Sequence, residues 1–181
     1  MHYLIIPGID GSGEDHWQSL WQARWGAAAT RIAPASWSEP DLEDWCRAID
    51  RAAEGAVLLV AHSLGCLAAA HWAARRPGAA AGLFLVAPPD PAGPAFPAAA
   101  APTFVPFVPS PPGVPGLVVH SDDDPYCTPE AARRLAAGWE LPALSVGPAG
   151  HVNAASGLGA WEAGRALLTA FAAGVRTPVR R

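Results

Sequence analysis

A serine between two small residues is the feature of this sequence best suited to chemistry. Ser63 is the third residue of AHSLG (61–65), which follows the apolar run 57–61 and precedes the alanine-rich run 66–74. This pattern predicts a buried strand, a tight turn with the serine at its tip, and a helix. Such a turn exposes the hydroxyl above the sheet as a nucleophile. The alternative is a serine that only caps the helix of an ordinary strand–helix turn.

A serine hydroxyl needs a base to take its proton and a carboxylate to orient that base. His151 is the candidate base. Asp124 is the preferred acid of three consecutive aspartates, because Pro125 after it fixes the turn. Asp122 and Asp123 are expected to cap that turn or to contact solvent. The order serine, acid, histidine, each just after a predicted strand, is the order of the α/β-hydrolases.

Acyl transfer also needs donors for the negative oxygen of its tetrahedral intermediate. We expect one from the backbone N–H of Leu64, directly after the serine, and one from the loop PGIDGSG (7–13) after the first strand. Ile9 is the predicted donor in that loop. Asp10 is the next candidate, and it is also a candidate for substrate contact.

The elements that must position these residues alternate along the chain. The predicted strands are 3–6, 31–34, 57–61, 82–87, 116–120 and 141–146, and the predicted helices are 14–24, 39–53, 64–74, 130–137 and 160–173. Alternation of this kind indicates an α/β domain, with a parallel sheet and helices on both faces. Right-handed crossovers then bring the carboxyl ends of the strands, and the loops described above, to one edge of the sheet.

Residues 88–115 interrupt this alternation. Eleven of the twenty prolines lie here, together with Phe96, Phe104 and Phe107, and a proline-rich segment does not form a central strand. A flexible surface loop or linker is one interpretation. The phenylalanines favour an ordered cover over part of the sheet edge. We expect Phe104 and Phe107 to form an apolar wall of the site, where they would affect KM more than stability.

Composition bounds what the protein binds and where it works. The chain has 181 residues, 51% of them hydrophobic, and suits a single domain over 1–174, with Gly174 ending the last helix and a frayed basic tail at 175–181. Its formal net charge of −4 gives no support for nucleic-acid binding. No stretch resembles a signal peptide or a membrane span.

Three widely spaced cysteines argue against a disulfide framework or a zinc site and for a reducing compartment. We therefore expect a soluble cytoplasmic protein that needs no metal and no organic cofactor. The expected partner is a small acyl substrate, with neither nucleic acid nor membrane.

Five motifs in order resemble one known family. They are PGIDGSG with HWQ (7–18), AHSLGC (61–66), APPD (87–90), DDPYC (123–127) and GHVNA with SGLG (150–159). Together they resemble the small serine hydrolases of the family of YdeN and retinoblastoma-binding protein nine. The resemblance implies a minimal α/β-hydrolase without a lid domain, whose six parallel strands follow the order 2-1-3-4-5-6. It also implies a triad of Ser63, Asp124 and His151, and it favours Asp124 over its neighbours.

Several other residues are expected near the site or in the core. His16 either borders the site or holds its loop by a hydrogen bond. Asn153 is expected to support the histidine loop, and His62 to pack sideways. Three tryptophans with helical spacing are expected to serve packing; they are Trp17, Trp21 and Trp25.

The predicted activity is that of a carboxylesterase-like serine hydrolase, which cleaves a small ester, thioester or amide through an acyl-enzyme. Acyl transfer to an acceptor other than water uses the same residues and stays open. The competing class is a non-catalytic protein-binding module on a hydrolase fold, which would have a protein partner. The presence of serine, acid, base and both oxyanion loops favours the enzyme.

Overall fold

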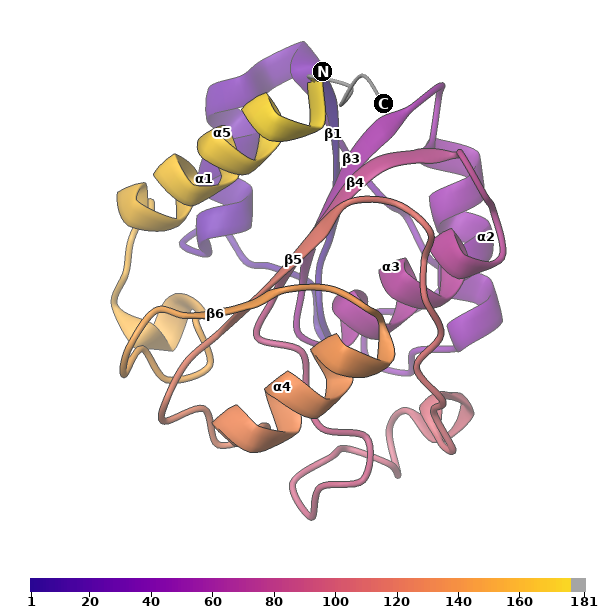
Figure 1. The fold of residues 1–181 in the computed structure, drawn as a ribbon, viewed down its shortest axis with the longest axis vertical. Helices are drawn as coiled ribbons and strands as arrows, with labels where there is room; N and C mark the ends of the chain where they lie inside the picture. Colours follow the sequence, from indigo (N-terminus) through magenta and orange to yellow (C-terminus); the bar gives the residue numbers. More distant parts are fainter. Residues whose placement is uncertain (177–181) are drawn as a thin grey trace.

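A six-stranded parallel sheet forms the centre of this computed structural model, which describes residues 1–176 (Figure 1). The strands are β1 (His2–Ile6), β2 (Ala29–Arg31), β3 (Val57–His62), β4 (Ala80–Val86), β5 (Gly116–His120) and β6 (Ala143–Ser145). The helices are α1 (Trp17–Trp25), α2 (Leu42–Ala52), α3 (Leu64–Ala74), α4 (Pro129–Gly138) and α5 (Glu162–Arg176). The strand order β2-β1-β3-β4-β5-β6 confirms the predicted topology.

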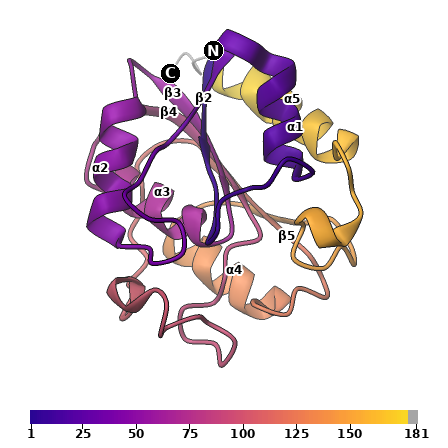
Figure 2. The ribbon, with the colours of Figure 1, turned by 180° about the vertical axis from the view of Figure 1, so that it is seen from behind.

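The sheet separates two apolar layers, because successive side chains of a strand point to opposite faces. Leu59 and Ala61 of β3 pack with α2, α3 and α4, whereas Leu58 and Val60 pack with α1 and α5. Figures 1 and 2 show the same division of the helices between the two faces. All of β3 is buried, which explains why its sequence is continuously apolar rather than alternating.

Both edge strands are shorter than predicted. β2 covers Ala29–Arg31 instead of 31–34, because Pro34 has no N–H to continue a ladder. β6 covers Ala143–Ser145 instead of 141–146. Its backbone pairing with β5 nevertheless continues on both sides, since Pro142 and Val146 also hydrogen-bond to β5, at 2.9 and 3.0 Å.

The last helix is longer than predicted. α5 continues through Gly174 to Arg176, because Gly174 does not adopt the positive φ with which a glycine ends a helix. Val175 after it lies over Gly82 of β4, so the helix gains a further buried contact. The predicted tail 175–181 thus begins inside α5, and its residues 177–181 lie outside the described residues. Within 1–176, no helix is long and apolar enough to cross a membrane.

The proline-rich segment 88–115 is ordered, and its buried phenylalanines pack on helices. Phe104 is fully buried, with its ring centroid 5.8 Å from that of Trp45 in α2. The hydroxyl of Thr103 accepts a hydrogen bond from the backbone N–H of Leu42, at the start of the same helix (2.9 Å). Figure 1 shows the segment at the lower edge of the view, beside α4.

Candidate active site

Ser63 lies at a sharp turn between β3 and α3, as predicted from the pentapeptide. Its φ of 54° and ψ of −130° are unusual for a residue with a side chain. The turn brings α3 against the end of β1, where a Cβ on Gly65 would collide with the carbonyl oxygens of Ile6 and Pro7. The Ser63 side chain makes no capping bond to α3. This finding argues against the helix-cap alternative and leaves the hydroxyl free to react.

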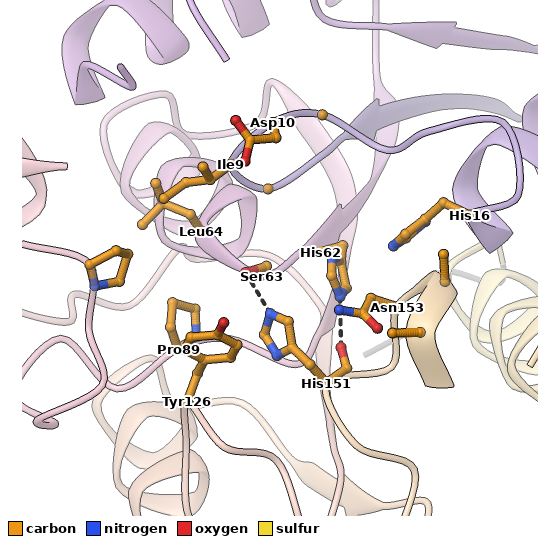
Figure 3. Close-up of a pocket in the computed structure, with 15 residues that line it drawn as sticks. Ile9, Asp10, His16, His62, Ser63, Leu64, Pro89, Tyr126, His151 and Asn153 are labelled. Carbon is orange, nitrogen blue, oxygen red and sulfur yellow. Dashed lines mark hydrogen bonds between the residues drawn. The ribbon is translucent and has the colours of Figure 1, made fainter. Parts of the chain in front are cut away.

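The three predicted triad residues come together at the carboxyl edge of the sheet. The Oγ atom of Ser63 lies 2.8 Å from Nε2 of His151 (Figure 3). Nδ1 of His151 lies 3.0 and 2.9 Å from the two carboxylate oxygens of Asp124. Because a carboxylate only accepts, Nδ1 carries the proton, and Nε2 is left to accept from the serine hydroxyl. The Asp124 side chain is only 2% exposed, so water does not compete for this pair.

The three adjacent aspartates bind different partners. Asp124 faces the imidazole of His151. Asp123 accepts hydrogen bonds from the hydroxyl of Ser121 and the backbone N–H of Gly150, both at 2.7 Å. These two bonds favour its ionised form and lower the pKa of Asp123. Asp122 accepts from a serine hydroxyl of β6 at 2.6 Å. Asp123 thus connects the loop after β5 to the loop that carries His151.

The loop after β1 passes directly over Ser63. A Cβ on Gly8 would lie 2.7 Å from the Cβ of Ser63, so only glycine permits this approach. The N–H of Asp10 donates to a backbone carbonyl at 3.0 Å, which leaves that of Ile9 as the candidate oxyanion donor from this loop. Leu64 occupies the first position of α3, where backbone N–H groups have no partner within the helix.

A cavity of about 440 Å³ surrounds the Ser63 hydroxyl. Figure 3 shows its two sides. Apolar and aromatic side chains predominate on one side of Ser63, and they are Ile9, Leu64, Pro89 and Tyr126. Asp10 also lines the cavity, next to Ile9. Polar side chains lie on the other, and they are His16, His62 and Asn153. The cavity therefore offers an apolar and a polar subsite on either side of the reacting atom.

Phe104 and Phe107 lie away from this cavity, so they do not form the expected apolar wall. Phe104 is buried against α2, and Phe107 lines a separate hollow beside α4. Large apolar side chains gain most from full burial, and the layer of helices offers it. The proline-rich segment contributes Pro89 and Pro97 to the cavity instead.

Tyr126 is a cavity residue to which the sequence analysis assigned no role. Its ring centroid lies 4.6 Å from that of His151, and the residue is 40% exposed. The backbone N–H of Tyr126 donates to Asp124 at 2.9 Å. Its place two residues after Asp124, the candidate acid, is the sequence signal that could have identified it.

Two buried histidine rings pack behind the candidate base in tilted and edge-on contacts. The ring centroid of His62 lies 5.0 Å from that of His151 and 4.7 Å from that of His16. Burial, with smaller contributions from Arg31 and His151, lowers the pKa of His16 to about 4. Burial also lowers the pKa of His62 well below its usual value. Both rings are therefore neutral at pH 7.

The hydrogen bonds of these histidines fix the surrounding backbone. Nε2 of His62 donates to the carbonyl oxygen of His151 at 2.9 Å, so His62 does more than pack sideways. Nδ1 of His16 accepts from the N–H of Gln18 at 3.1 Å and caps α1. His16 thus both borders the cavity and holds the start of a helix. Asn153 lines the cavity from the histidine loop.

The cysteines are buried and do not compete with Ser63 as nucleophiles. Burial raises the pKa of each of the free cysteines, Cys46, Cys66 and Cys127, and a protonated buried thiol is unreactive. Among residues 1–176, no three His, Cys, Asp or Glu side chains are grouped so that they could hold a metal ion.

Comparison with known proteins agrees with this geometry. The family model described as serine hydrolase matches residues 3–170. A protein of Pectobacterium atrosepticum, assigned as a YdeN-like hydrolase, is 33% identical, with a TM-score of 0.84 over 96% of this chain and 91% of that one. A search of curated proteins gave no match.

Two more distant structures share the fold. The ydeN gene product of B. subtilis is 21% identical, with a TM-score of 0.70 over 95% of this chain and 98% of that one. The type II thioesterase BorB, from the borrelidin biosynthetic cluster, is 18% identical, with a TM-score of 0.62 over 96% of this chain and 92% of that one.

Proposed function

This chain belongs to the serine hydrolase family, and from that premise we propose that it cleaves a small ester, thioester or amide. Ser63 is the nucleophile, His151 the general base and Asp124 the acid that orients it. The observation that carries this proposal is the unbroken line of hydrogen bonds from Asp124 through His151 to the strained serine.

The first half of the reaction forms an acyl-enzyme. The Oγ atom of Ser63 attacks the acyl carbon while Nε2 of His151 takes its proton. The oxygen of the former carbonyl becomes negative, and the N–H groups of Leu64 and Ile9 are the proposed donors to it. The intermediate then collapses, the bond to the leaving group breaks, and His151 returns the proton to that group.

The second half releases the acid. Water enters from the open cavity, gives its proton to His151, and attacks the acyl carbon of the ester on Ser63. The second tetrahedral intermediate uses the same oxyanion donors, and its collapse returns the proton to Oγ. The carboxylate of Asp124 stabilises the imidazolium that forms in each half.

The two sides of the cavity support an assignment of substrate parts. An acyl chain fits the side of Ile9, Pro89 and Tyr126, next to the proposed oxyanion donors, and a polar leaving group fits the side of His16 and Asn153. A volume of about 440 Å³ suits a small substrate rather than a long lipid. We also propose a cytoplasmic location, which the free thiols of the three cysteines support.

A fluorophosphonate probe tests the activated serine directly. Wild type is expected to gain the mass of one adduct, and Ser63→Ala to gain none, because the probe reacts only with a serine whose proton a base can take. Ser110→Ala removes an exposed serine from the proline-rich segment and should label like wild type. Short esters, thioesters and aminoacyl amides then identify the substrate class.

An absence of adduct on folded wild-type protein would contradict the hydrolase proposal. That result would favour the protein-binding module, and capture of a protein partner would be the next experiment.

A further inference from the structure

The loop that carries the candidate base is hydrogen-bonded residue by residue to other elements. The bonds join Ala149 N–H to Ser121 Oγ (2.8 Å), Gly150 N–H to Asp123 (2.7 Å), His151 C=O to His62 Nε2 (2.9 Å) and Val152 C=O to Trp17 Nε1 (2.8 Å). Two of them come from the loop after β5, and the other two come from β3 and α1. The backbone on both sides of the catalytic imidazole is therefore held from two directions.

The bond between Trp17 and Val152 holds a residue with an unusual backbone conformation. The φ of Val152 is 48°, a left-handed conformation that a β-branched residue rarely adopts. Its side chain is fully buried in the layer that contains Trp17. A residue keeps such a conformation only where its surroundings impose it. Because Val152 directly follows His151, its conformation determines where the backbone of the catalytic residue points.

The start of α1 is also bonded to the strand that carries the nucleophile. Gln18 is fully buried, and its side-chain N–H group donates to the carbonyl oxygens of Val60 in β3 (3.0 Å) and Ile6 in β1 (3.3 Å). Trp17 precedes it and holds the carbonyl of Val152. One turn of one helix thus contacts both the strand that leads to Ser63 and the loop that carries the base.

We propose that Trp17 is a positioning residue for catalysis: its indole N–H holds the strained Val152, and thereby His151, at a fixed distance from Ser63, with Gln18 anchoring the same helix to the nucleophile strand. The proposal rests on the proposed hydrolase function. Its physical basis is that a displacement of a reacting group by about 1 Å can cost about 10²-fold in rate. It replaces the expectation that the tryptophan stripe serves packing alone.

Trp21 provides a matched control within the same helix. It is as fully buried as Trp17, the two ring centroids are 4.5 Å apart, and both rings pack on Trp161. Its indole N–H also donates to a backbone carbonyl, that of Ala160, at 2.6 Å. The two tryptophans differ in which carbonyl they hold, and only one of these carbonyls is next to His151. The ring of Trp17 also lies against His16 and His62, with centroids 5.3 and 6.0 Å apart, and a phenylalanine ring at this position can still make these ring contacts.

The test compares Trp17→Phe with Trp21→Phe. Each variant keeps an aromatic ring and loses one buried indole N–H, so both should lower the melting temperature by similar amounts. We expect kcat for a short activated ester, and the rate of fluorophosphonate labelling, to fall about tenfold to a hundredfold in Trp17→Phe. In Trp21→Phe both should stay within about threefold of wild type. KM should change little in either, because neither tryptophan lines the cavity.

Amide hydrogen exchange reads the same contact without any catalytic event. Trp17→Phe should accelerate exchange in residues 149–153, whereas Trp21→Phe should accelerate it near residue 160. Equal losses of kcat in the two variants, or unchanged exchange at 149–153 in Trp17→Phe, would overturn the proposal. If wild type neither labels nor hydrolyses any ester, the proposed function fails, and the exchange experiment still decides whether Trp17 holds the loop.

Discussion

The proline-rich segment 88–115 and the histidine loop 147–159 both leave the sheet without forming a strand or an α-helix, but different interactions hold them. Apolar packing predominates in the first, where Phe104 is fully buried and Phe96 nearly so, although hydrogen bonds such as that from Leu42 N–H to the hydroxyl of Thr103 also join it to other elements. Directional bonds hold the second, where side chains of Ser121, Asp123 and other elements bind successive backbone groups. Packing keeps a segment in place, whereas directional bonds also fix the orientation of its backbone.

This difference separates two kinds of sensitivity to mutation. A general base must point at its nucleophile, so the histidine loop should respond to changes mainly in rate. The proline-rich segment contributes Pro89 and Pro97 to the cavity but buries its large side chains elsewhere. It should respond mainly in stability. Three variants test this separation.

Asp124→Asn should have the largest effect. The asparagine keeps the shape of the carboxylate but cannot stabilise the imidazolium, and it favours the wrong tautomer of His151. We expect kcat to fall by about 10⁴-fold, with little change in melting temperature. Steady-state kinetics with a short activated ester and a thermal melt measure both quantities. Asp122→Asn, next in the chain but bonded to β6, is the control and should stay within a few-fold of wild type.

If Asp122→Asn and Asp124→Asn lowered kcat equally, the contact of Asp124 with His151 would have no special role in catalysis. The contrast between the histidine loop and the proline-rich segment would then not hold.

Phe104→Ala should show the opposite pattern. The ring is fully buried against Trp45, and removal of such a ring costs about 3–5 kcal/mol of unfolding free energy. The kcat of the folded fraction should stay within about twofold. Denaturant unfolding and kinetics at low temperature measure the two effects. Val108→Ala in the same segment, at a side chain 79% exposed, should change stability by less than about 0.5 kcal/mol.

If Phe104→Ala changed the acyl-chain preference without a loss of stability, a structural role for Phe104 would be contradicted. The segment would then form a wall of the substrate site, as the sequence analysis expected.

The sequence predicts the sheet order and the meeting of Ser63, Asp124 and His151, because both depend on local patterns. The strand–serine–helix pattern at 57–74 determines the turn at Ser63, and the loops with Asp124 and His151 each follow an apolar run. Alternation of strands and helices then places all three at one edge of the sheet. No detailed knowledge of packing is needed for these inferences.

The contacts that hold the site are less accessible to sequence analysis. Spacing indicates that Trp17 and His62 are buried, but it does not indicate that their ring N–H groups meet carbonyls 135 and 89 residues away. The burial of Phe104 against α2 is equally hard to predict, because a proline-rich segment has no periodicity that indicates which apolar layer its side chains enter. The prediction that Gly174 ends the last helix is wrong, because a glycine ends a helix in this way only with a positive φ, which Gly174 does not adopt.

Asp123→Ala should have the smallest effect of the three variants. It tests most directly whether hydrogen bonds to the backbone of the histidine loop control the rate. The exposed carboxylate of Asp123 contacts no predicted substrate group, yet it accepts the N–H of Gly150, next to His151. We expect kcat to fall about tenfold because the base is less well oriented, with Asp122→Ala as the control that changes kcat little. If both variants keep wild-type kcat, the backbone bonds of the histidine loop do not control the rate.

The pH dependence of the same variant provides an independent measurement. Hydrogen bonds from Ser121 and Gly150 lower the pKa of Asp123 below its usual 3.8 in the folded protein. A group with a lowered folded pKa stabilises the fold above its unfolded pKa, and that contribution is lost as the pH falls through the folded value. The difference in melting temperature between wild type and Asp123→Ala should therefore be constant at neutral pH and narrow below about pH 4. A difference that stays constant down to pH 2 would mean that the charge of Asp123 contributes nothing to holding the loop.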